Sequence, residues 1–335
     1  MIRIGINGLG RIGRCIIRAI NEYNYKDIEI VAVNGPADIN DHAHLIKYDS
    51  VHGVFNEEVK VDNDTLIVGR HKMRLTRERD ISKLDWAKYG VDIVLECTGK
   101  FNKRDEAAKH LDYGAKKVLV SAPCESADST IVYGVNHDKL LPSHKVVSIG
   151  SCTTNCLGPV AKVLHETIGI ESGFMTTIHS YTNDQNILDG SHKDLRRARA
   201  GAVSMVPTTT GAAKAIGLVI PELAGKLGGS SVRVPTPNVS LVDLCFNASR
   251  ETTKEEINEI LSNAANNYMK GVLAVTNKPL VSIDFNHDSH SSTADLLETY
   301  VTNKKFCRVV SWYDNEWGFS VRMLDVTRLL AKGGF

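Results

Sequence analysis

Short apolar runs alternate with segments of helical period through the first half of the chain. "IRIGI" near the start and residues 28–33, 91–99, 117–123 and 145–150 predict short buried strands. Residues 11–22 carry apolar side chains at positions 12, 16, 17 and 20, which predicts a helix. "KRDEAAKHLDYGA" supplies another helix between two strands. Strand–helix–strand alternation of this kind favours a parallel sheet covered by helices on both faces.

The pattern changes after residue 156. "GFMTTIHSY", "SSVRVPTPNVSLVDLCFNA" and "KPLVSIDFNHD" are longer, rich in Val, Thr and Ser, and predict antiparallel connections. Helices are expected in "TTTGAAKAIGLVIPEL", in "TKEEINEILSNAANNYM" and at the end in "EWGFSVRMLDVTRLLAKG". The predicted class is α/β: a doubly wound Rossmann domain over 1–150 and an α+β catalytic domain over 151–315 with a mixed, mostly antiparallel sheet. Segment 316–335 is expected to pack back on the first domain.

Composition excludes several classes of protein. A chain of 335 residues is too long for one ordinary core and suits two domains. A formal net charge of +1 gives no general argument for nucleic acid or membrane binding. Because no apolar run approaches the roughly 20 residues of a membrane helix, and "IRIGING" follows Met1 directly, we expect a cytoplasmic protein.

The seven cysteines are scattered along the chain and odd in number. This pattern is typical of reduced thiols and not of a disulfide framework. A zinc site would usually show a second Cys or His pair at ligand spacing, so we expect no metal.

A glycine-rich turn joins the first strand to the first helix. In "GINGLGRIG", Gly8, Gly10 and Gly13 have the spacing and context of a dinucleotide-binding turn. Gly8 permits the tight turn, Gly10 lets a pyrophosphate approach the backbone, and Gly13 lets the helix pack closely on the strand. The alternative is a glycine-rich turn that binds nothing.

The acidic residue expected at the end of the second strand is missing. Such a carboxylate holds the adenosine ribose about 20 residues after the glycine turn. Here the strand ends "AVNGPAD", with Gly35 where an Asp would stand. Without the carboxylate a 2′-phosphate is no longer repelled, so NADP use becomes possible beside NAD.

Cys152 stands where a strand-like segment meets a helix, in "VVSIGSCTTNCLGPV". The first N–H groups of that helix are expected to lower the pKa of the Cys152 thiol. His179 in "FMTTIHSYTNDQ" is the leading candidate for the base that pairs with this nucleophile. A buried structural cysteine and a hydrogen-bonded core histidine remain open on these grounds alone.

Six motifs together resemble the phosphorylating glyceraldehyde-3-phosphate dehydrogenase family. They are "INGLGRIGR", "SCTTNC", "HSYTNDQ", "PTTTGAAKA", "RVPTPNVS" and "WYDNEWGFS", and they occur in the family's order. The resemblance implies that Cys152 forms a thiohemiacetal with the aldehyde and His179 takes the proton. Hydride transfer to NAD(P) then leaves a thioester, which inorganic phosphate cleaves to 1,3-bisphosphoglycerate, in glycolysis or gluconeogenesis.

The resemblance also implies two anion sites and a set of cofactor contacts. The substrate phosphate would lie at Thr182, Asp184 and Arg233, with Asp184 orienting Arg233. The attacking phosphate would lie at Ser151, Thr153, Arg197, Thr210 and Gly211. The cofactor would contact Arg11 and Ile12 at its pyrophosphate, Arg79 at its adenine, Ser121 beside its ribose–nicotinamide region, and Asn315 at its amide.

Two departures from the family's pattern relax the preference for NAD over NADP. Gly35 replaces the usual Asp, and Gly190-Ser191 stands where members that prefer NAD often have Leu-Pro. The family further implies a homotetramer, with part of the basic loop "HKDLRRARAG" at an interface. Two alternatives stay open: erythrose-4-phosphate dehydrogenase, which shares the cysteine motif, and a nucleotide-responsive redox sensor that uses Cys152 as an oxidisable thiol.

Overall fold

The computed structural model describes residues 1–334, so the last residue of the segment expected over 316–335 lies outside the described residues. The chain divides into two compact units. The first comprises Met1–Ser151 together with the chain from Phe319 onward, and the second comprises Cys152–Gly318. Each unit has its own sheet and is described by itself.

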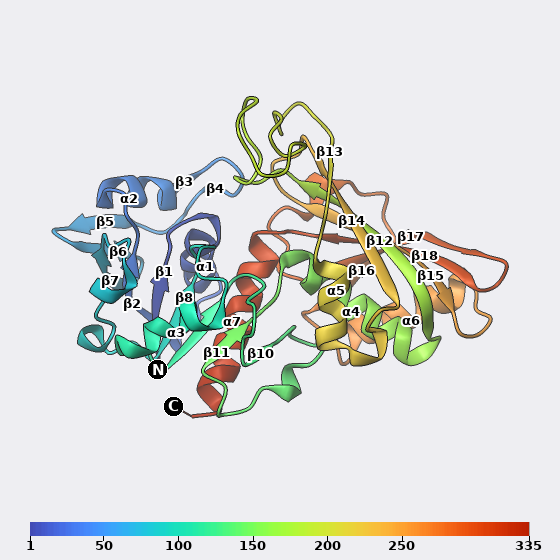
Figure 1. Cartoon of the computed structure of the whole chain (residues 1–335), viewed down its shortest axis with the longest axis horizontal. Coiled ribbons are helices and arrows are strands. Elements are labelled where there is room, and N and C mark those ends of the chain that lie inside the picture. The colour runs from blue at the N-terminus through green and yellow to red at the C-terminus, as the bar shows by residue number, and fades with distance from the viewer. Residues whose placement is uncertain (335) are drawn as a thin grey trace. The chain divides into compact units, whose positions relative to one another are not determined.

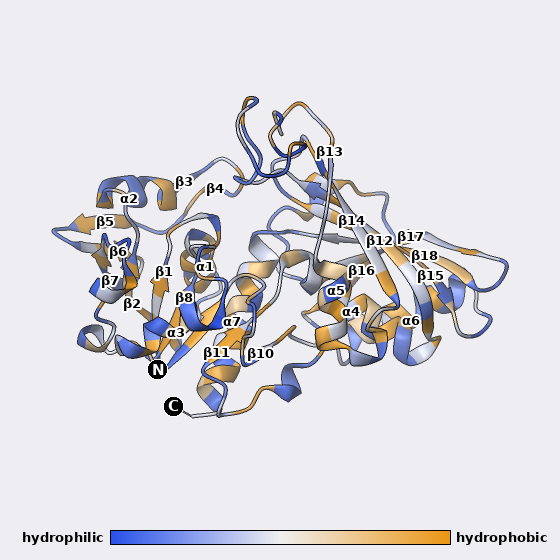
Figure 2. Cartoon of the chain, viewed as in Figure 1, coloured by the Kyte–Doolittle hydropathy of each residue, from blue (hydrophilic) through white to orange (hydrophobic). Residues whose placement is uncertain are grey.

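A nine-stranded sheet forms the first unit, in the order β10-β11-β9-β8-β1-β2-β7-β6-β5 (Figure 1). Every neighbouring pair from β10 to β7 is parallel, and β7, β6 and β5 continue the sheet as an antiparallel meander. Hydrophobic side chains dominate its central strands (Figure 2). The strands are β1 (Ile2–Asn7), β2 (Ile28–Asn34), β5 (Val59–Asp62), β6 (Thr65–Val68), β7 (His71–Thr76), β8 (Ile93–Glu96), β9 (Lys117–Val120), β10 (Ser129–Thr130) and β11 (Val146–Ser148).

Helices connect these strands, as the alternating pattern predicts. They are α1 (Arg11–Glu22), α2 (Ile39–Lys47) and α3 (Arg104–Asp112), with a short β3–β4 pair (Tyr48–Asp49 and Gly53–Val54) after α2. The last helix, α7 (Trp317–Lys332), enters this unit at Phe319. There the Lys117 ammonium donates to the Leu330 carbonyl at 3.1 Å, and the Arg328 Nε donates to Asp27 at 2.7 Å. These contacts fix the end of the chain against β9 and the start of β2.

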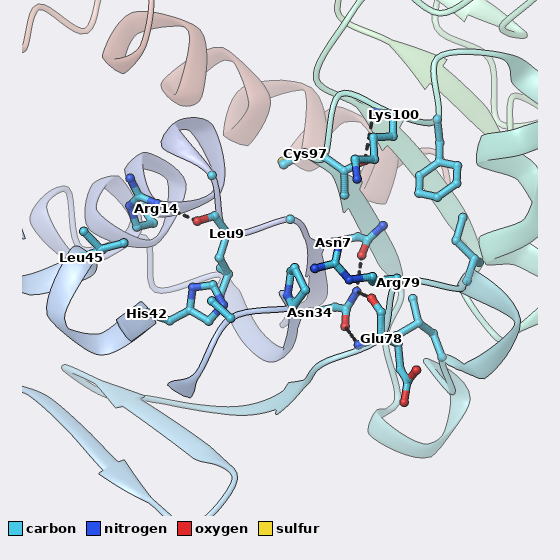
Figure 3. A pocket seen from close by; sticks show the side chains of 18 residues that line it. Asn7, Leu9, Arg14, Asn34, His42, Leu45, Glu78, Arg79, Cys97 and Lys100 are labelled. Carbon is cyan, nitrogen blue, oxygen red and sulfur yellow. Dashed lines mark hydrogen bonds between the residues drawn. The ribbon is translucent and has the colours of Figure 1, made fainter. Parts of the chain in front are cut away.

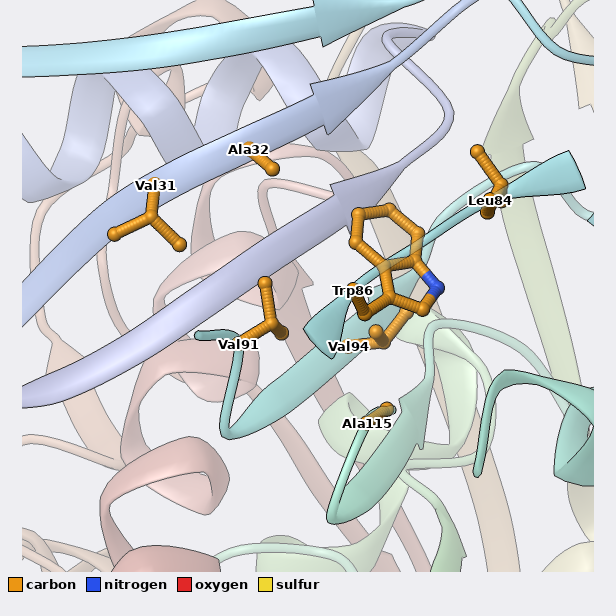
Figure 4. Packing of buried hydrophobic residues seen from close by; sticks show 7 residues of the cluster. All are labelled: Val31, Ala32, Leu84, Trp86, Val91, Val94 and Ala115. Carbon is orange, nitrogen blue, oxygen red and sulfur yellow. The ribbon is translucent and has the colours of Figure 1, made fainter. Parts of the chain in front are cut away.

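Trp86 is the centre of one hydrophobic cluster on this sheet (Figure 4). Its indole is 1% exposed and packs with Val91 and Val94. Gly5 in β1 makes room for the ring, because a Cβ there would lie 2.8 Å from the indole. A buried aromatic of this size contributes on the order of 3 kcal/mol or more to stability.

A buried polar network joins the carboxyl ends of the central strands. The Trp86 N–H donates to His110 Nδ1 at 3.0 Å, so the ring carries its proton on Nε2 and donates to Glu96 Oε2 at 3.0 Å. The same carboxylate accepts from the Asn7 amide at 2.6 Å and from the Thr98 N–H at 2.8 Å. Since Asn7, Thr98 and His110 all donate to this carboxylate, Glu96 fixes where β1 and β8 end relative to each other.

A seven-stranded mixed sheet forms the second unit, in the order β13-β14-β12-β15-β18-β17-β16. The β12–β14 and β16–β17 pairs are parallel and the other neighbours are antiparallel. The predicted fold class, a Rossmann sheet plus a mixed and mostly antiparallel sheet, is confirmed. The strands are β12 (Ile170–Ser180), β13 (Val206–Thr208), β14 (Leu227–Val234), β15 (Ser240–Ala248), β16 (Leu273–Thr276), β17 (Ser292–Thr302) and β18 (Phe306–Tyr313).

Three helices of this unit pack together against its sheet (Figure 1). They are α4 (Cys152–Thr167), α5 (Ala212–Val219) and α6 (Lys254–Asn266). Side chains of β15 alternate between buried and half-buried positions, which is typical of a sheet covered on one face. Across residues 1–334, no helix combines the length and the apolar character needed to cross a membrane.

The buried network gives a prediction about stability. Replacing Glu96 by Ala leaves the donors of Asn7, Thr98 and His110 without their common acceptor, so the free energy of unfolding should fall by about 3 kcal/mol. Urea unfolding of the full chain measures this. Glu58→Ala is the matched control, because the Glu58 side chain is 69% exposed and contacts only solvent and Lys60 at 2.8 Å. Equal unfolding midpoints for the two variants would show that the network does not stabilise the sheet.

Candidate functional site

The glycine turn has the geometry that its sequence predicts. Gly8 adopts φ +104°, and a Cβ there would lie 2.7 Å from the Thr98 nitrogen. A Cβ on Gly13 would lie 2.1 Å from the Gly8 carbonyl oxygen, so only glycine lets α1 approach β1 this closely. Around Gly10, by contrast, a Cβ would meet no atom within 4 Å, which leaves open space beside the backbone at the start of α1.

A cavity of about 390 Å³ opens at this turn (Figure 3). It lies where β1, β2 and β8 end, between strands whose connections leave in opposite directions, the usual position of ligands in such sheets. Leu84 and Phe101 provide apolar walls, while Asn7, Asn34 and Thr98 provide polar groups. Open space beside Gly10, the start of α1 and this cavity together fit the adenosine and pyrophosphate of a dinucleotide.

The predicted cofactor residues of the first unit differ in where they lie. Gly8, Gly10 and Arg79 line the cavity. The Arg11 side chain forms a two-pronged ion pair with Asp49, so its backbone at the first position of α1 is the part of the residue that would be expected to face a pyrophosphate. Ile12 and Gly13 follow in the same helical turn. Ser121 comes directly after β9, where its N–H donates to the Glu96 carbonyl at 3.0 Å.

Gly35 and His42 occupy neighbouring space at the end of β2. A Cβ on Gly35 would lie 2.6 Å from His42 Nε2, so the imidazole fills the room that a larger residue would need. His42 also lines the cavity and is 5% exposed. Sequence reasoning missed it, although Ile39, His42 and Ile46 recur at helical spacing and form the buried face of α2.

The second unit brings Cys152 and His179 together. Cys152 is the first residue of α4, directly after Ser151, and its Sγ lies 3.5 Å from His179 Nε2. His179 is near the end of β12, opposite Arg233 in the neighbouring parallel strand β14. The parallel register therefore sets the His179 imidazole beside the Arg233 guanidinium. The same imidazole lies beside the Cys152 thiol.

The contacts of His179 define its tautomer. Its Nδ1 lies 2.7 Å from the Ser180 carbonyl oxygen, a distance at which two acceptors would repel, so Nδ1 carries the proton and donates. Arg233 Nη1 donates to the same carbonyl at 3.2 Å and lies 3.0 Å from Nδ1. The unprotonated Nε2 consequently faces the Cys152 sulfur.

Burial governs the charge of this pair. Burial raises the pKa of the Cys152 thiol, although Arg233 and hydrogen bonds from the Thr153 amide and hydroxyl act in the opposite direction. The first N–H groups of α4 act in the expected direction, but the expected net lowering of the thiol pKa is wrong because loss of solvent outweighs them. Burial and the charge of Arg233 lower the pKa of His179 to about 3. At neutral pH the resting pair is an uncharged thiol and an uncharged imidazole.

Arg233 keeps an unused donor beside the sulfur. Its Nε is buried and has no hydrogen-bond partner within the described residues. Asp184, which the resemblance assigns to orienting Arg233, instead holds Arg197, with Nη1 of Arg197 2.5 Å from the carboxylate. That expectation is wrong, because the loop after β12 turns Asp184 toward the arginine within the same loop. Thr182 lies at the start of this loop, where its N–H donates to Gln185 at 3.0 Å.

The residues expected at the attacking phosphate have partners of their own. Arg197 donates from Nε to the Thr208 hydroxyl at 2.9 Å and from Nη2 to the Thr209 carbonyl at 3.2 Å. Thr210 accepts from the Ala212 N–H at 3.2 Å, just before α5, and a Cβ on Gly211 would meet no atom within 4 Å. This arrangement leaves room for a ligand at the start of α5.

Tyr313 and Asn315 are two further buried groups of this unit, the first beside His179 and the second the expected nicotinamide contact. Tyr313, which sequence reasoning missed, shares hydrogen bonds with the hydroxyls of Thr153 at 2.9 Å and Thr177 at 2.8 Å, and its ring packs edge-on against His179. Asn315 accepts from the hydroxyls of Ser180 and Ser240, both at 2.9 Å. These two bonds orient the Asn315 amide so that its NH₂ group points away from both hydroxyls.

Comparison with known proteins identifies the family. Residues 2–104 match the model described as glyceraldehyde 3-phosphate dehydrogenase, NAD binding domain, and residues 151–315 match the C-terminal domain of the same family. Proteins named glyceraldehyde-3-phosphate dehydrogenase from Xanthobacter flavus, Cereibacter sphaeroides and Geobacillus stearothermophilus are 59%, 58% and 56% identical to this chain. Each comparison covers 99% of both chains. The predicted resemblance is confirmed: the chain belongs to the glyceraldehyde-3-phosphate dehydrogenase family.

Proposed function

We propose that this chain oxidises D-glyceraldehyde 3-phosphate with NAD(P) and inorganic phosphate to 1,3-bisphosphoglycerate, through covalent intermediates on Cys152. Membership of the family makes the chain an NAD-dependent phosphorylating aldehyde dehydrogenase. The observation that carries the mechanism is the 3.5 Å contact between Cys152 Sγ and the unprotonated Nε2 of His179.

The first step forms a bond between Cys152 Sγ and the aldehyde carbon. The thiol proton passes to His179 Nε2 as the sulfur attacks and then to the aldehyde oxygen, which gives a thiohemiacetal. The neutral resting pair suits this order, because the proton moves as the new bond forms. The Cys152 N–H at the start of α4 is placed to stabilise the developing oxyanion.

The second step oxidises the thiohemiacetal. Bound NAD(P) supplies the acceptor for the hydride that leaves the former aldehyde carbon. His179 Nε2 takes the hydroxyl proton as the carbon–oxygen double bond forms, and the product on the sulfur is a thioester. Attack by a phosphate oxygen then breaks the carbon–sulfur bond, and the Cys152 thiolate leaves beside the positively charged His179.

Two groups of residues would hold the anions. Arg233 would bind the substrate phosphate through its unpaired Nε, with Thr182 beside it and Asp184 acting through Arg197. Arg197 would share the attacking phosphate with Ser151, Thr153, Thr210 and Gly211. The three contacts of Arg197 use three of its five N–H groups, so it can still donate to a dianion.

We further propose that 1–150 and 316–335 form the NAD(P)-binding domain and that 151–315 form the catalytic and tetramerisation domain. In the first, the backbone from Gly8 to Gly13 would hold the pyrophosphate and Arg79 the adenine. Ser121 would lie beside the nicotinamide ribose, and the NH₂ group of Asn315 would bind the nicotinamide amide. Gly35 and Gly190-Ser191 permit NADP beside NAD.

Of the two alternatives, neither is favoured by a specific observation. All three relatives carry the name of the triose phosphate enzyme and not that of erythrose-4-phosphate dehydrogenase. A redox sensor would need an oxidisable thiolate, whereas burial keeps the Cys152 thiol protonated in the resting pair.

Replacing the nucleophile tests the function directly. Cys152→Ser should lower kcat for phosphate-dependent NADH formation from glyceraldehyde 3-phosphate by roughly three orders of magnitude or more, because an alcohol is a far weaker nucleophile and leaving group. Cys245→Ser, which changes a half-buried thiol in β15, is the control. NADH formation that survives Cys152→Ser would exclude the thioester mechanism.

The proton acceptor has its own test. In His179→Asn the buried thiol has no base to take its proton, so alkylation of Cys152 by iodoacetamide at pH 7 should slow by about tenfold or more. Because burial raises the thiol pKa, the rate should recover only as pH rises above the ordinary thiol range of about 8.5. Peptide mass spectrometry isolates the Cys152 adduct, and His144→Asn serves as the control. A rate profile identical to that of the wild type would remove His179 from this role.

A homotetramer is the proposed assembly. Large apolar side chains are exposed in the second unit, on the loop after β12 and on strands of its sheet: Phe174, Ile187, Leu188, Leu195, Val203, Met205, Tyr300 and Phe306. Large apolar side chains exposed to this extent are typical of contact surfaces. Sedimentation equilibrium should give about four times the chain mass of 36.8 kDa, and Leu195→Asp with Met205→Asp should lower it. A monomer at micromolar concentration would contradict the proposal.

A further inference from the structure

The end of β2 holds an imidazole in the position where a ribose-binding carboxylate would stand. His42 Nε2 and Cε1 lie 2.6 and 2.9 Å from the point where a Cβ on Gly35 would be. An aspartate at position 35 would therefore overlap the ring. In dinucleotide-binding sheets the side chain that follows the second strand contacts the 2′-oxygen of the adenosine ribose. Here the His42 ring occupies the space in which a side chain at position 35 would lie.

The ring nitrogens of His42 can hydrogen-bond to a ligand. Neither ring nitrogen makes a hydrogen bond of regular geometry within the described residues, although Nε2 lies beside the Gly35 backbone and the residue is 5% exposed. Buried polar atoms normally have partners, and an unpartnered one that lines a cavity indicates a bound group. Figure 3 shows the ring on the cavity wall beside Leu9 and Arg14.

Charges around His42 favour an anion. Arg14 and Arg77 are close enough to lower its pKa together with burial, which is the larger cause, while the Gly35 backbone and Asp41 act in the opposite direction. Asp38, the first carboxylate after Gly35, is already engaged: it accepts from the Asn40 N–H at 2.9 Å and pairs with Arg77 at 2.9 Å. Arg77 thus offsets the charge with which Asp38 would repel a phosphate.

The charged residues that line the cavity also favour an anion. Among the described lining residues the cations are Arg14, Arg79 and Lys100, and Glu78 is the one acidic residue. In Figure 3 Glu78 lies on the opposite side of the cavity from His42. A ligand group beside His42 therefore meets donors and positive charge.

We propose that His42 is a cofactor-specificity residue whose imidazole binds the 2′-phosphate of NADP at the end of β2. The proposal rests on the proposed function only in that the first unit binds a nicotinamide dinucleotide. Gly35 and His42 act as a pair: the glycine removes the carboxylate and the space it leaves admits the ring. A hydrogen bond from His42 to a phosphate oxygen then distinguishes NADP from NAD.

Calorimetric titration of the full chain with adenosine 2′,5′-bisphosphate and with 5′-AMP tests the proposal without any turnover. His42→Leu should weaken binding of the bisphosphate by about tenfold and binding of 5′-AMP by less than about twofold. His44→Leu, an exposed position on the same helix, should change neither affinity. Equal weakening of both ligands, or of neither, would show that His42 only fills space and would overturn the proposal.

A second pair of variants guards against a folding defect in His42→Leu. Gly35→Asp alone meets the imidazole, whereas Gly35→Asp with His42→Ala gives the carboxylate room and should reverse the preference toward 5′-AMP and NAD. If Gly35→Asp and the double variant Gly35→Asp with His42→Ala showed the same preference between the two ligands, the proposal would also be overturned. NAD-dependent oxidation of glyceraldehyde 3-phosphate by the wild type is measured separately, so its absence would contradict the proposed function and not the role of His42.

Discussion

Parallel pairing of neighbouring strands is the constraint on which both sites depend. Parallel strands end at the same edge of a sheet, so residues far apart in sequence meet there without any loop having to position them. In the first unit Asn7, Asn34 and Thr98 reach one cavity from the ends of β1, β2 and β8. In the second unit the β12–β14 pair sets His179 beside Arg233 within an otherwise mostly antiparallel sheet. The antiparallel strands supply a face for α4 to pack on, and α4 in turn begins at Cys152.

Burial has the largest effect on the pKa of the Cys152 thiol. The start of a helix and a nearby guanidinium both favour a thiolate, yet the burial of the Cys152 thiol raises its pKa by more than these groups lower it. Arg233 also disfavours a charged His179, so in the proposed mechanism proton transfer within the pair accompanies bond formation. A site of this kind holds its nucleophile protonated until an electrophile is bound. Adventitious reactions of the thiol are limited for the same reason.

Sequence patterns predicted much of the fold because its strands and helices are locally consistent. The central strands of the first sheet and the glycine turn follow from period, position and the backbone freedom of Gly8. The antiparallel strands β5 and β6 were not predicted, since each spans only four residues, which is too short for its alternation to be distinctive. Asp184 was assigned to the wrong arginine because contacts between long side chains depend on the path of a loop, which no periodicity records. His42 was not identified as a site residue because helical spacing shows only that it lies on the buried face of its helix, and not which atoms surround its ring.

Arg233 differs from three other arginines of the two sites, because each of those pairs with an aspartate. Arg11 is held by Asp49, Arg77 by Asp38 and Arg197 by Asp184, so each of these positive charges is largely balanced before a ligand arrives. Arg233 instead donates to a neutral acceptor, the Ser180 carbonyl, and its Nη1 lies 3.0 Å from Nδ1 of the uncharged His179 ring. Its charge therefore acts fully on the buried sulfur and on any phosphate at its Nε. A balanced arginine such as Arg197 can still donate its remaining N–H groups to an anion, but the neighbouring carboxylate reduces the attraction. The unbalanced Arg233 supplies the stronger attraction, and it does so next to the carbon that must react.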